Sequence, residues 1–192
     1  MAADALATAI RAEAGLGHGV AEWHARSGDA LRSILQSTHT AASPPLAGLS
    51  LVRPDLLAQV EERAAAAARD AASRHVAHLE GIAREYGAAL GAFAGELARL
   101  RITLSRARPD VGDEPTTWRV VASLDARLVA YEGDCALLTH ITSSLSTLAQ
   151  PHEYHALLAA LRLSPFLSEP GARAARSLLD AQGSTPTPTG TV

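Results

Sequence analysis

The sequence predicts an all-α protein built on a long antiparallel helical hairpin of coiled-coil type, with shorter helices before and after it. Two long segments repeat apolar side chains at steps of three and four, which is the period of a buried helical face. A short segment rich in Pro and Gly separates them. The apolar content of 47% consists mostly of Ala and Leu, and suffices for one core, so we expect a single domain over residues 1–181.

The N-terminal part is predicted to form two helices. Residues 3–14 have helical composition, but three glycines follow within residues 15–19. Each glycine costs a helix about 1 kcal/mol relative to Ala, so we expect the helix to break there. A second helix is expected over residues 20–36, and the prolines and glycine within residues 37–53 indicate a loop.

The first helix of the hairpin is expected from residue 55 to about residue 107. Pro54 suits the first turn of a helix, and Asp55 places a carboxylate where the helix dipole favours it. At 1.5 Å per residue this helix would be roughly 75 to 80 Å long. Its apolar side chains form one heptad seam at Ala72, Val76, Leu79, Ala83, Tyr86, Leu90, Phe93, Leu97, Leu100 and Leu104.

The second helix of the hairpin follows a turn at residues 108–115, which contain two prolines and a glycine. Thr116 or Thr117 is expected to cap this helix. Because the turn is short, the two helices can pair antiparallel, and the hairpin is expected over about residues 55–149. The second seam comprises Val121, Leu124, Leu128, Tyr131, Cys135, Leu138, Ile141, Leu145 and Leu148.

The C-terminal part is predicted to contain short helices and a disordered tail. Pro151 suits the first turn of a helix that contains Tyr154 and ends at Ser164-Pro165. Another short helix is expected over residues 171–181. Residues 182–192 are rich in Thr, Pro and Gly without an apolar face, which predicts disorder.

The composition excludes several classes of protein. Its 17 basic and 20 acidic residues are spread along the chain, so no single-signed field indicates direct nucleic-acid binding. Cys135 is the single cysteine, which excludes an intramolecular disulfide and fits a reducing compartment. No run of about 18 apolar residues and no cleavable leader occur, so we expect an intracellular protein without a membrane span.

Sequence motifs for chemistry are sparse, and we expect neither an enzyme nor a cofactor nor a metal site. No Gly-x-Ser-x-Gly motif occurs, and Cys135 occupies a seam position expected to be buried and unreactive. His75 and His78 share one helical face, as do His152 and His155, but eight histidines often fall three apart by chance. A His-based helical-bundle metalloprotein is one alternative, and a self-assembling structural coiled coil is another.

Two tryptophans and the seam side chains are the candidate interaction residues. Trp23 lies outside the seams and Trp118 begins the second hairpin helix; each fits a packing anchor better than a partner contact, although Trp is enriched in binding hot spots. We expect part of the seam and the Trp23 region to pair with a sibling helical subunit, because the hairpin exposes more apolar edge than one short helix covers. The expected core and interaction residues are Trp23, Leu79, Tyr86, Phe93, Leu97, Trp118, Leu128, Tyr131, Leu138 and Phe166.

Several stretches carry a family resemblance. Five stretches occur in this order: Ala21-Glu22-Trp23-His24, Pro115-Thr116-Thr117-Trp118, Leu128-x-x-Tyr131-x-x-Asp134, Leu145-x-x-Leu148-Ala149 and Leu161-Arg162-Leu163-Ser164-Pro165-Phe166-Leu167-Ser168-Glu169. Together they resemble the cyclin-dependent kinase 2-interacting protein family. Leu49-x-x-x-Arg53-Pro54-Asp55-Leu56 and the helix after it are similar to a related family, the AAA+ ATPase-interacting ribosome maturation factor also described as a casein kinase 2 substrate.

Both resemblances imply the same kind of protein. They imply a small, helical, non-catalytic adaptor subunit in a complex with a hexameric AAA+ ATPase and a helical sibling subunit. Such a complex acts in maturation of the large ribosomal subunit and in DNA replication and genome maintenance, in the nucleus or cytoplasm. The first family's name adds a cyclin-dependent kinase as a partner. The chain departs from that family's pattern in the Ala-rich stretch at residues 64–68 and in its lack of Lys.

Overall fold

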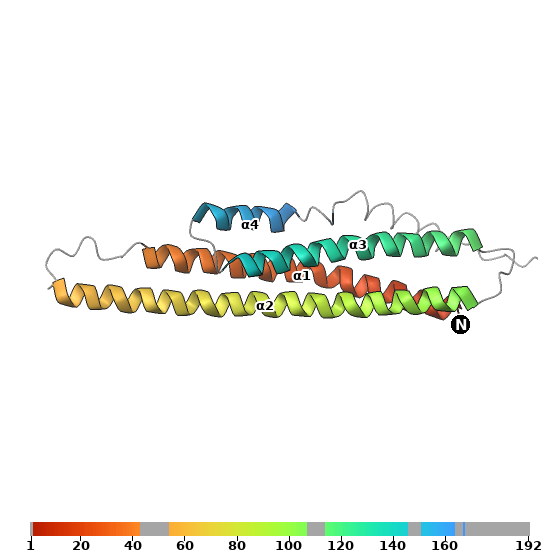
Figure 1. Ribbon diagram of the computed structural model, residues 1–192, viewed down its shortest axis with the longest axis horizontal. Helices are drawn as coiled ribbons and strands as arrows, with labels where there is room; N and C mark the ends of the chain where they lie inside the picture. The colour runs from red at the N-terminus through yellow and green to blue at the C-terminus, as the bar shows by residue number, and fades with distance from the viewer. Residues whose placement is uncertain (1, 43–53, 107–113, 146–150, 164–166, 168–192) are drawn as a thin grey trace, which may run out of the picture. The chain divides into compact units, whose positions relative to one another are not determined.

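The computed structural model of the protein describes residues 2–42, 54–106, 114–145, 151–163 and 167. These residues form four α-helices and no strand, which confirms the all-α prediction (Figure 1). None of the described helices is long and apolar enough to cross a membrane. The helices are α1 (Ala2–Ala42), α2 (Pro54–Arg106), α3 (Glu114–Ser144) and α4 (Pro151–Leu163).

The described residues divide into two compact units, and each helix except α4 contributes to both. Unit 1 contains residues 2–18 of α1, 88–106 of α2 and 114–134 of α3. Unit 2 contains the remainder of these three helices together with α4. The expectation of a single domain over residues 1–181 stays a prediction.

The interior of unit 1 is formed by α2 and α3 together with the first part of α1. The Phe93 ring meets the Tyr131 ring edge-on, with the ring centroids 6.4 Å apart. An ion pair joins Arg101 to Asp125 at 2.5 Å. Residue 93 therefore lies opposite residue 131 and residue 101 opposite residue 125, so α2 and α3 run in opposite directions over this stretch. The buried apolar side chains of the unit are Ala9, Leu16, Phe93, Leu97, Leu100, Val120, Val121, Leu124 and Tyr131.

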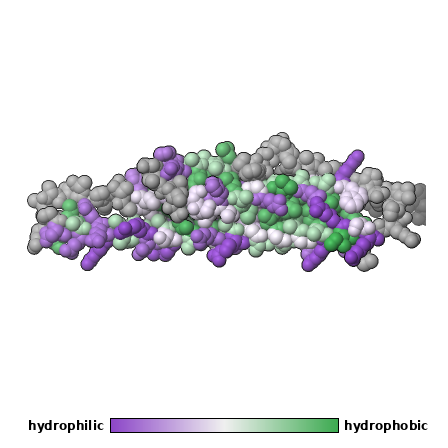
Figure 2. Space-filling view, in the orientation of Figure 1, coloured by the Kyte–Doolittle hydropathy of each residue, from purple (hydrophilic) through white to green (hydrophobic). Residues whose placement is uncertain are grey.

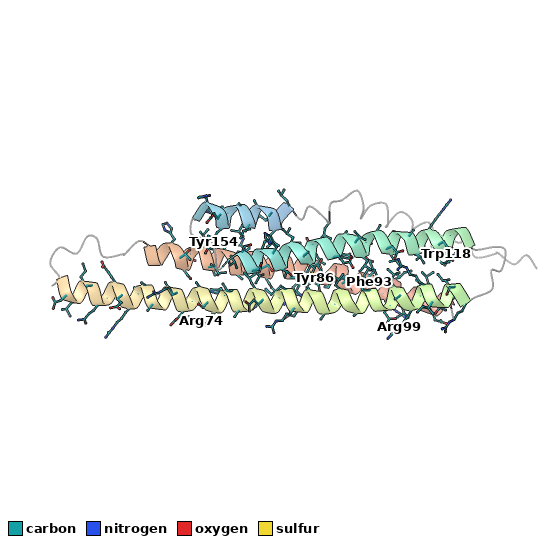
Figure 3. All side chains as sticks on the ribbon, in the orientation of Figure 1. Arg74, Tyr86, Phe93, Arg99, Trp118 and Tyr154 are labelled. Carbon is teal, nitrogen blue, oxygen red and sulfur yellow. The ribbon has the colours of Figure 1, made fainter. Side chains whose placement is uncertain are left out.

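Unit 2 contains an aromatic pair between α1 and α2. The rings of Trp23 and Tyr86 stack with centroids 4.8 Å apart and an angle of 23° between their planes. Tyr86 is fully buried, and Figure 3 shows it pointing away from the exposed side of α2, where Arg74 lies. Leu138, Ile141 and Leu145 of α3 and Tyr154, Leu158 and Leu161 of α4 complete the interior of unit 2, with Val20, Ala30, Leu31, Ile34, Leu79 and Ile82.

Several predicted elements are confirmed at their boundaries. The long helix α2 begins at Pro54 and ends at Arg106, one residue before the expected end. The short helix α4 begins at Pro151, as proline at a helix start suggests. Helix α3 begins at Glu114, so Thr116 and Thr117 lie inside the helix, and the prediction that one of them caps it is wrong. Pro115 fits the first turn of this earlier start. The predicted helix at residues 171–181 and the tail at residues 182–192 lie outside the described residues.

The predicted break in the N-terminal part is wrong, because α1 is continuous through the glycines at residues 15–19. Buried positions continue along one face of the helix on both sides of the glycines, at Ala9, Glu13, Leu16, Val20, Ser27, Ala30, Leu31 and Ile34. Burial of each large apolar side chain contributes about 1.5 to 3 kcal/mol, which offsets the intrinsic cost of the glycines. The predicted loop at residues 37–53 is also wrong for residues 37–42, which are helical; residues 43–53 lie outside the described residues.

One of the glycines allows a close approach between helices. A Cβ atom added at Gly17 would lie 3.0 Å from the hydroxyl oxygen of Tyr131, tighter than ordinary van der Waals contact. The absence of a side chain at Gly17 therefore makes room for the Tyr131 hydroxyl beside α1. A glycine that breaks an isolated helix is here a packing residue.

Two glycines of α1 are expected to respond differently to substitution by alanine. A Cβ at Gly28 would meet nothing within 4 Å, so Gly28→Ala should raise the free energy of unfolding by about 0.5 to 1 kcal/mol through helix propensity. A Cβ at Gly19 would lie 2.8 Å from the Trp23 ring, which would have to shift. Gly19→Ala should therefore give little or no gain. Urea unfolding followed by circular dichroism measures both; equal stabilisation by the two variants would contradict the prediction.

Candidate functional site

Most of the predicted seam residues lie in the interior of the protein. Leu79, Tyr86 and Leu138 are buried in unit 2. Phe93, Leu97 and Tyr131 are buried in unit 1, whereas Leu128 is only half-buried. These buried side chains pack within their own units; their role in a coiled-coil hairpin stays a prediction. Phe166 lies outside the described residues.

Trp23 is an internal anchor of unit 2. Its ring is half-buried against Tyr86, and beside it Arg26 donates a hydrogen bond of 2.8 Å to Glu85. This hydrogen bond lowers the pKa of Glu85 against the opposing effect of burial, and a hydrogen bond with Trp23 adds to the lowering. The same contact with Glu85 raises the pKa of Arg26. Trp23 is thus engaged within the unit, and its stacked face is not available to a partner.

Trp118, by contrast, lies on an exposed apolar surface of unit 1. Its side chain is 44% exposed, and Ile102 of α2 is 51% exposed. Both line an open cleft of about 480 Å³ between α2 and α3. Figure 3 shows Trp118 near the start of α3. We call this surface the Trp118 patch, and its residues are Arg101, Ile102, Ser105, Trp118, Val121, Ala122 and Asp125.

A second surface is a groove in unit 2 between α1 and α4. Tyr154, Leu158 and Leu161 attach α4 to the unit, and burial raises the pKa of Tyr154, with a further rise from the charge of Glu153. The groove has a volume of about 800 Å³. We call it the α1–α4 groove; it is lined by Arg32, Leu35, Gln36, His39, His155, Leu158, Ala159, Arg162 and Leu163.

A buried polar cluster in unit 1 was not predicted from the sequence. Glu13 of α1 is only 4% exposed. Its carboxylate forms an ion pair with Arg127 and accepts a hydrogen bond of 2.9 Å from the Tyr131 hydroxyl. The sequence does contain a feature that could have indicated this cluster. Glu13 is charged, yet it falls in heptad register with the apolar residues Ala9, Leu16 and Val20. A carboxylate in a buried register position indicates a partner on another helix.

The beginning of α2 carries exposed apolar side chains. Leu56 and Val60 are four residues apart, share one face of the helix, and are both about half exposed. Within residues 55–78 no side chain is buried, and the first buried one on α2 is Leu79. This part of α2 therefore presents apolar surface that the described residues do not cover.

The histidines considered as metal ligands do not form a metal-binding cluster among the described residues. His75 is half-buried, and His78, His152 and His155 are exposed. Among the described residues, no group of three or more His, Cys, Asp or Glu side chains is placed to hold a metal ion. Cys135 was expected to be buried, but it is half-buried. The reason is that the buried face of α3 steps from Tyr131 to Asp134 and then to Leu138, so Asp134 takes the buried position.

Comparisons with known proteins give no relative of this chain. The sequence matches no protein-family model, and no curated protein and no solved structure match it. The resemblance to the two helical families therefore rests on the motifs quoted above. Of these motifs, the segment at residues 115–118 ends at the exposed Trp118, whereas Tyr131 and Asp134 lie in the interior.

Proposed function

We propose that this protein is a non-catalytic helical adaptor subunit that binds a sibling helical subunit within an AAA+ ATPase complex. The observation that carries the adaptor role is the Trp118 patch, an exposed apolar surface between two packed helices. The resemblance to the two families supplies the kind of assembly. In that assembly the chain acts in large ribosomal subunit maturation and in DNA replication and genome maintenance, in the nucleus or cytoplasm.

The composition of the Trp118 patch suits a helical partner. Its centre is apolar, with Ile102 and Trp118 beside Val121 and Ala122, and its rim carries the Arg101–Asp125 ion pair. An apolar centre within a polar rim is the usual anatomy of a protein interface. A cleft between two antiparallel helices accepts the side chains of a third helix as knobs into holes. We expect Trp118 to be the hot spot of this contact, because it is a large aromatic side chain whose exposed area the partner would bury.

The extended coiled-coil hairpin over residues 55–149 is part of this proposal. The opposed contacts at residues 93 and 131 and at residues 101 and 125 support it in unit 1. The exposed Leu56 and Val60 support a second contact, in which the start of α2 lies against the sibling helix. We propose that the ATPase contacts this chain within the assembled complex. The name of the first family adds a cyclin-dependent kinase as a further partner there. The proposal includes no direct contact between this chain and nucleic acid.

The first test is affinity purification of the tagged protein from its own cells, with mass spectrometry of the proteins recovered. The expected result is recovery of AAA+ ATPase subunits together with a second small helical protein. Recovery of the chain alone, or of its own copies only, would overturn the adaptor role and favour a self-assembling coiled coil.

Trp118→Ala is expected to release the sibling subunit while leaving the fold intact. Loss of a hot-spot tryptophan weakens binding by about 2 kcal/mol or more, which is roughly thirtyfold in Kd. The matched control is Val129→Ala, because Val129 is an apolar residue of α3 that is 66% exposed and lies outside the patch. Titration of the purified sibling against both variants measures the effect. Equal affinity of the two variants would show that the patch is not the binding surface.

A further inference from the structure

The α1–α4 groove carries a spacing that repeats on both of its walls. Arg32, Leu35 and His39 lie at steps of three and four along α1. His155, Leu158 or Ala159, and Arg162 repeat the same steps along α4. The first and last of these residues on each wall are seven positions apart, which is about 10 Å or two helical turns. Walls of this length can contact two turns of a bound helix.

The charge of the groove has one sign. Arg32 and His39 stand on one wall, His155 and Arg162 on the other, and the described lining residues include no carboxylate. Outside the lining, Asp29 forms an ion pair with Arg32 one turn away on α1. Each margin of the groove thus carries one arginine, and on the α1 side Asp29 opposes the charge of Arg32.

The lining between the basic side chains is mostly apolar. It includes Leu35, Leu158 and Ala159, and Leu163, at the end of α4, is 76% exposed. Figure 2 shows apolar surface over the C-terminal part of α4. A surface with an apolar centre and two basic margins complements a helix with an apolar stripe flanked by acidic side chains.

We propose that the α1–α4 groove binds an acidic amphipathic helix of a partner protein. The apolar stripe of that helix lies on Leu35, Ala159 and Leu163, and its Glu or Asp side chains meet Arg32 and Arg162. The site lies in unit 2 and shares no residue with the Trp118 patch, so it does not depend on the proposed function.

The test measures binding of a synthetic peptide to the full chain by fluorescence anisotropy. The peptide has about 18 residues, enough to form a helix, with Leu along one face and Glu on both sides of that face. A matched peptide has Gln in place of every Glu, and vesicles of phosphatidylserine test for a general affinity for anionic surfaces. The Glu peptide is expected to bind about tenfold more tightly than the Gln peptide, and this preference should shrink at high salt.

Two variants are expected to change the affinity in opposite directions. Arg32→Gln with Arg162→Gln should weaken binding of the Glu peptide about tenfold, because both margins lose a charge. Asp29→Asn should strengthen it about threefold, because Arg32 is released from its intramolecular ion pair. A gain of affinity cannot arise from loss of folding. Arg74→Gln is the control, since Arg74 is an exposed arginine of α2 outside the groove.

Three results would overturn the inference. The first is equal binding of the Glu and Gln peptides. The second is an unchanged affinity in both the double arginine variant and Asp29→Asn. The third is that vesicle binding depends on Arg32 and Arg162 while binding of the Glu peptide does not. That result would assign the groove to a membrane surface instead.

Discussion

Glu13→Ala is expected to lower the free energy of unfolding by about 3 to 5 kcal/mol, one of the two largest effects of any single substitution proposed for this protein. The Glu13 carboxylate is buried in unit 1 and is shared between the Arg127 guanidinium and the Tyr131 hydroxyl. Its removal leaves the mostly buried Arg127 without this counter-charge. Most of the loss of stability comes from that uncompensated charge. A buried ion pair stabilises a protein little more than an apolar pair of the same size, but removal of one partner leaves a buried charge and strongly destabilises the fold.

A double-mutant cycle separates this effect from simple loss of packing. Glu13→Leu combined with Arg127→Met removes both charges and should recover much of the stability lost in Glu13→Leu alone. Urea unfolding monitored by circular dichroism measures each variant. The matched control is Glu85→Ala in unit 2, which breaks the more exposed ion pair with Arg26 and should have a much smaller effect. If Glu13→Ala were no more destabilising than Glu85→Ala, the buried cluster would not be a determinant of stability.

Phe93→Ala is expected to destabilise unit 1 by about 3 to 5 kcal/mol. Phe93 is fully buried on α2, and Figure 3 shows its side chain directed toward the neighbouring helices. Truncation removes the buried ring, leaves a cavity, and also removes the edge-on contact with Tyr131. Phe93→Leu fills most of the same volume and should cost less than half as much.

The location of this effect can be measured as well as its size. Hydrogen exchange should show protection lost first in residues 88–106 and 114–134, which belong to unit 1, with a smaller change at residues 19–42 of unit 2. Val129→Ala, on the exposed side of α3, should change stability by less than about 0.5 kcal/mol. A uniform loss of protection in both units would show that they unfold as one.

Helix boundaries that depend on local chemistry could be predicted from the sequence. Pro54 and Pro151 begin α2 and α4 because proline fits the first turn of a helix. Proline has no backbone N–H group, and in the first turn that group would have no hydrogen-bond acceptor within the helix. The heptad steps of α2 correctly identified Leu79, Tyr86 and Phe93 as buried. These features depend on residues close together in the chain, for which periodicity and propensity are sufficient guides.

The candidate surfaces were predicted only in part. The sequence drew attention to both tryptophans, but only the structure distinguishes the stacked Trp23 from the exposed Trp118. It also supplied no indication that Arg32 and Arg162, which are distant in the chain, line one groove. Exposure and charge clustering depend on which helix faces pack, and a single amphipathic pattern does not specify its partner.

By itself, the sequence determined that this chain is helical, where the long helix begins and ends, and that Leu79, Tyr86 and Phe93 are buried. Other positions of the same predicted seam are only half-buried, namely Ala72, Val76, Ala83, Leu90 and Leu104. The tertiary structure decided that α1 continues through its glycines, because burial along one face outweighs their intrinsic cost. It also decided that Glu13 is buried, because its partners Arg127 and Tyr131 are more than a hundred residues away in the chain. Local propensity acts over a few residues, whereas contacts between distant helices select which faces are buried and which remain for partners.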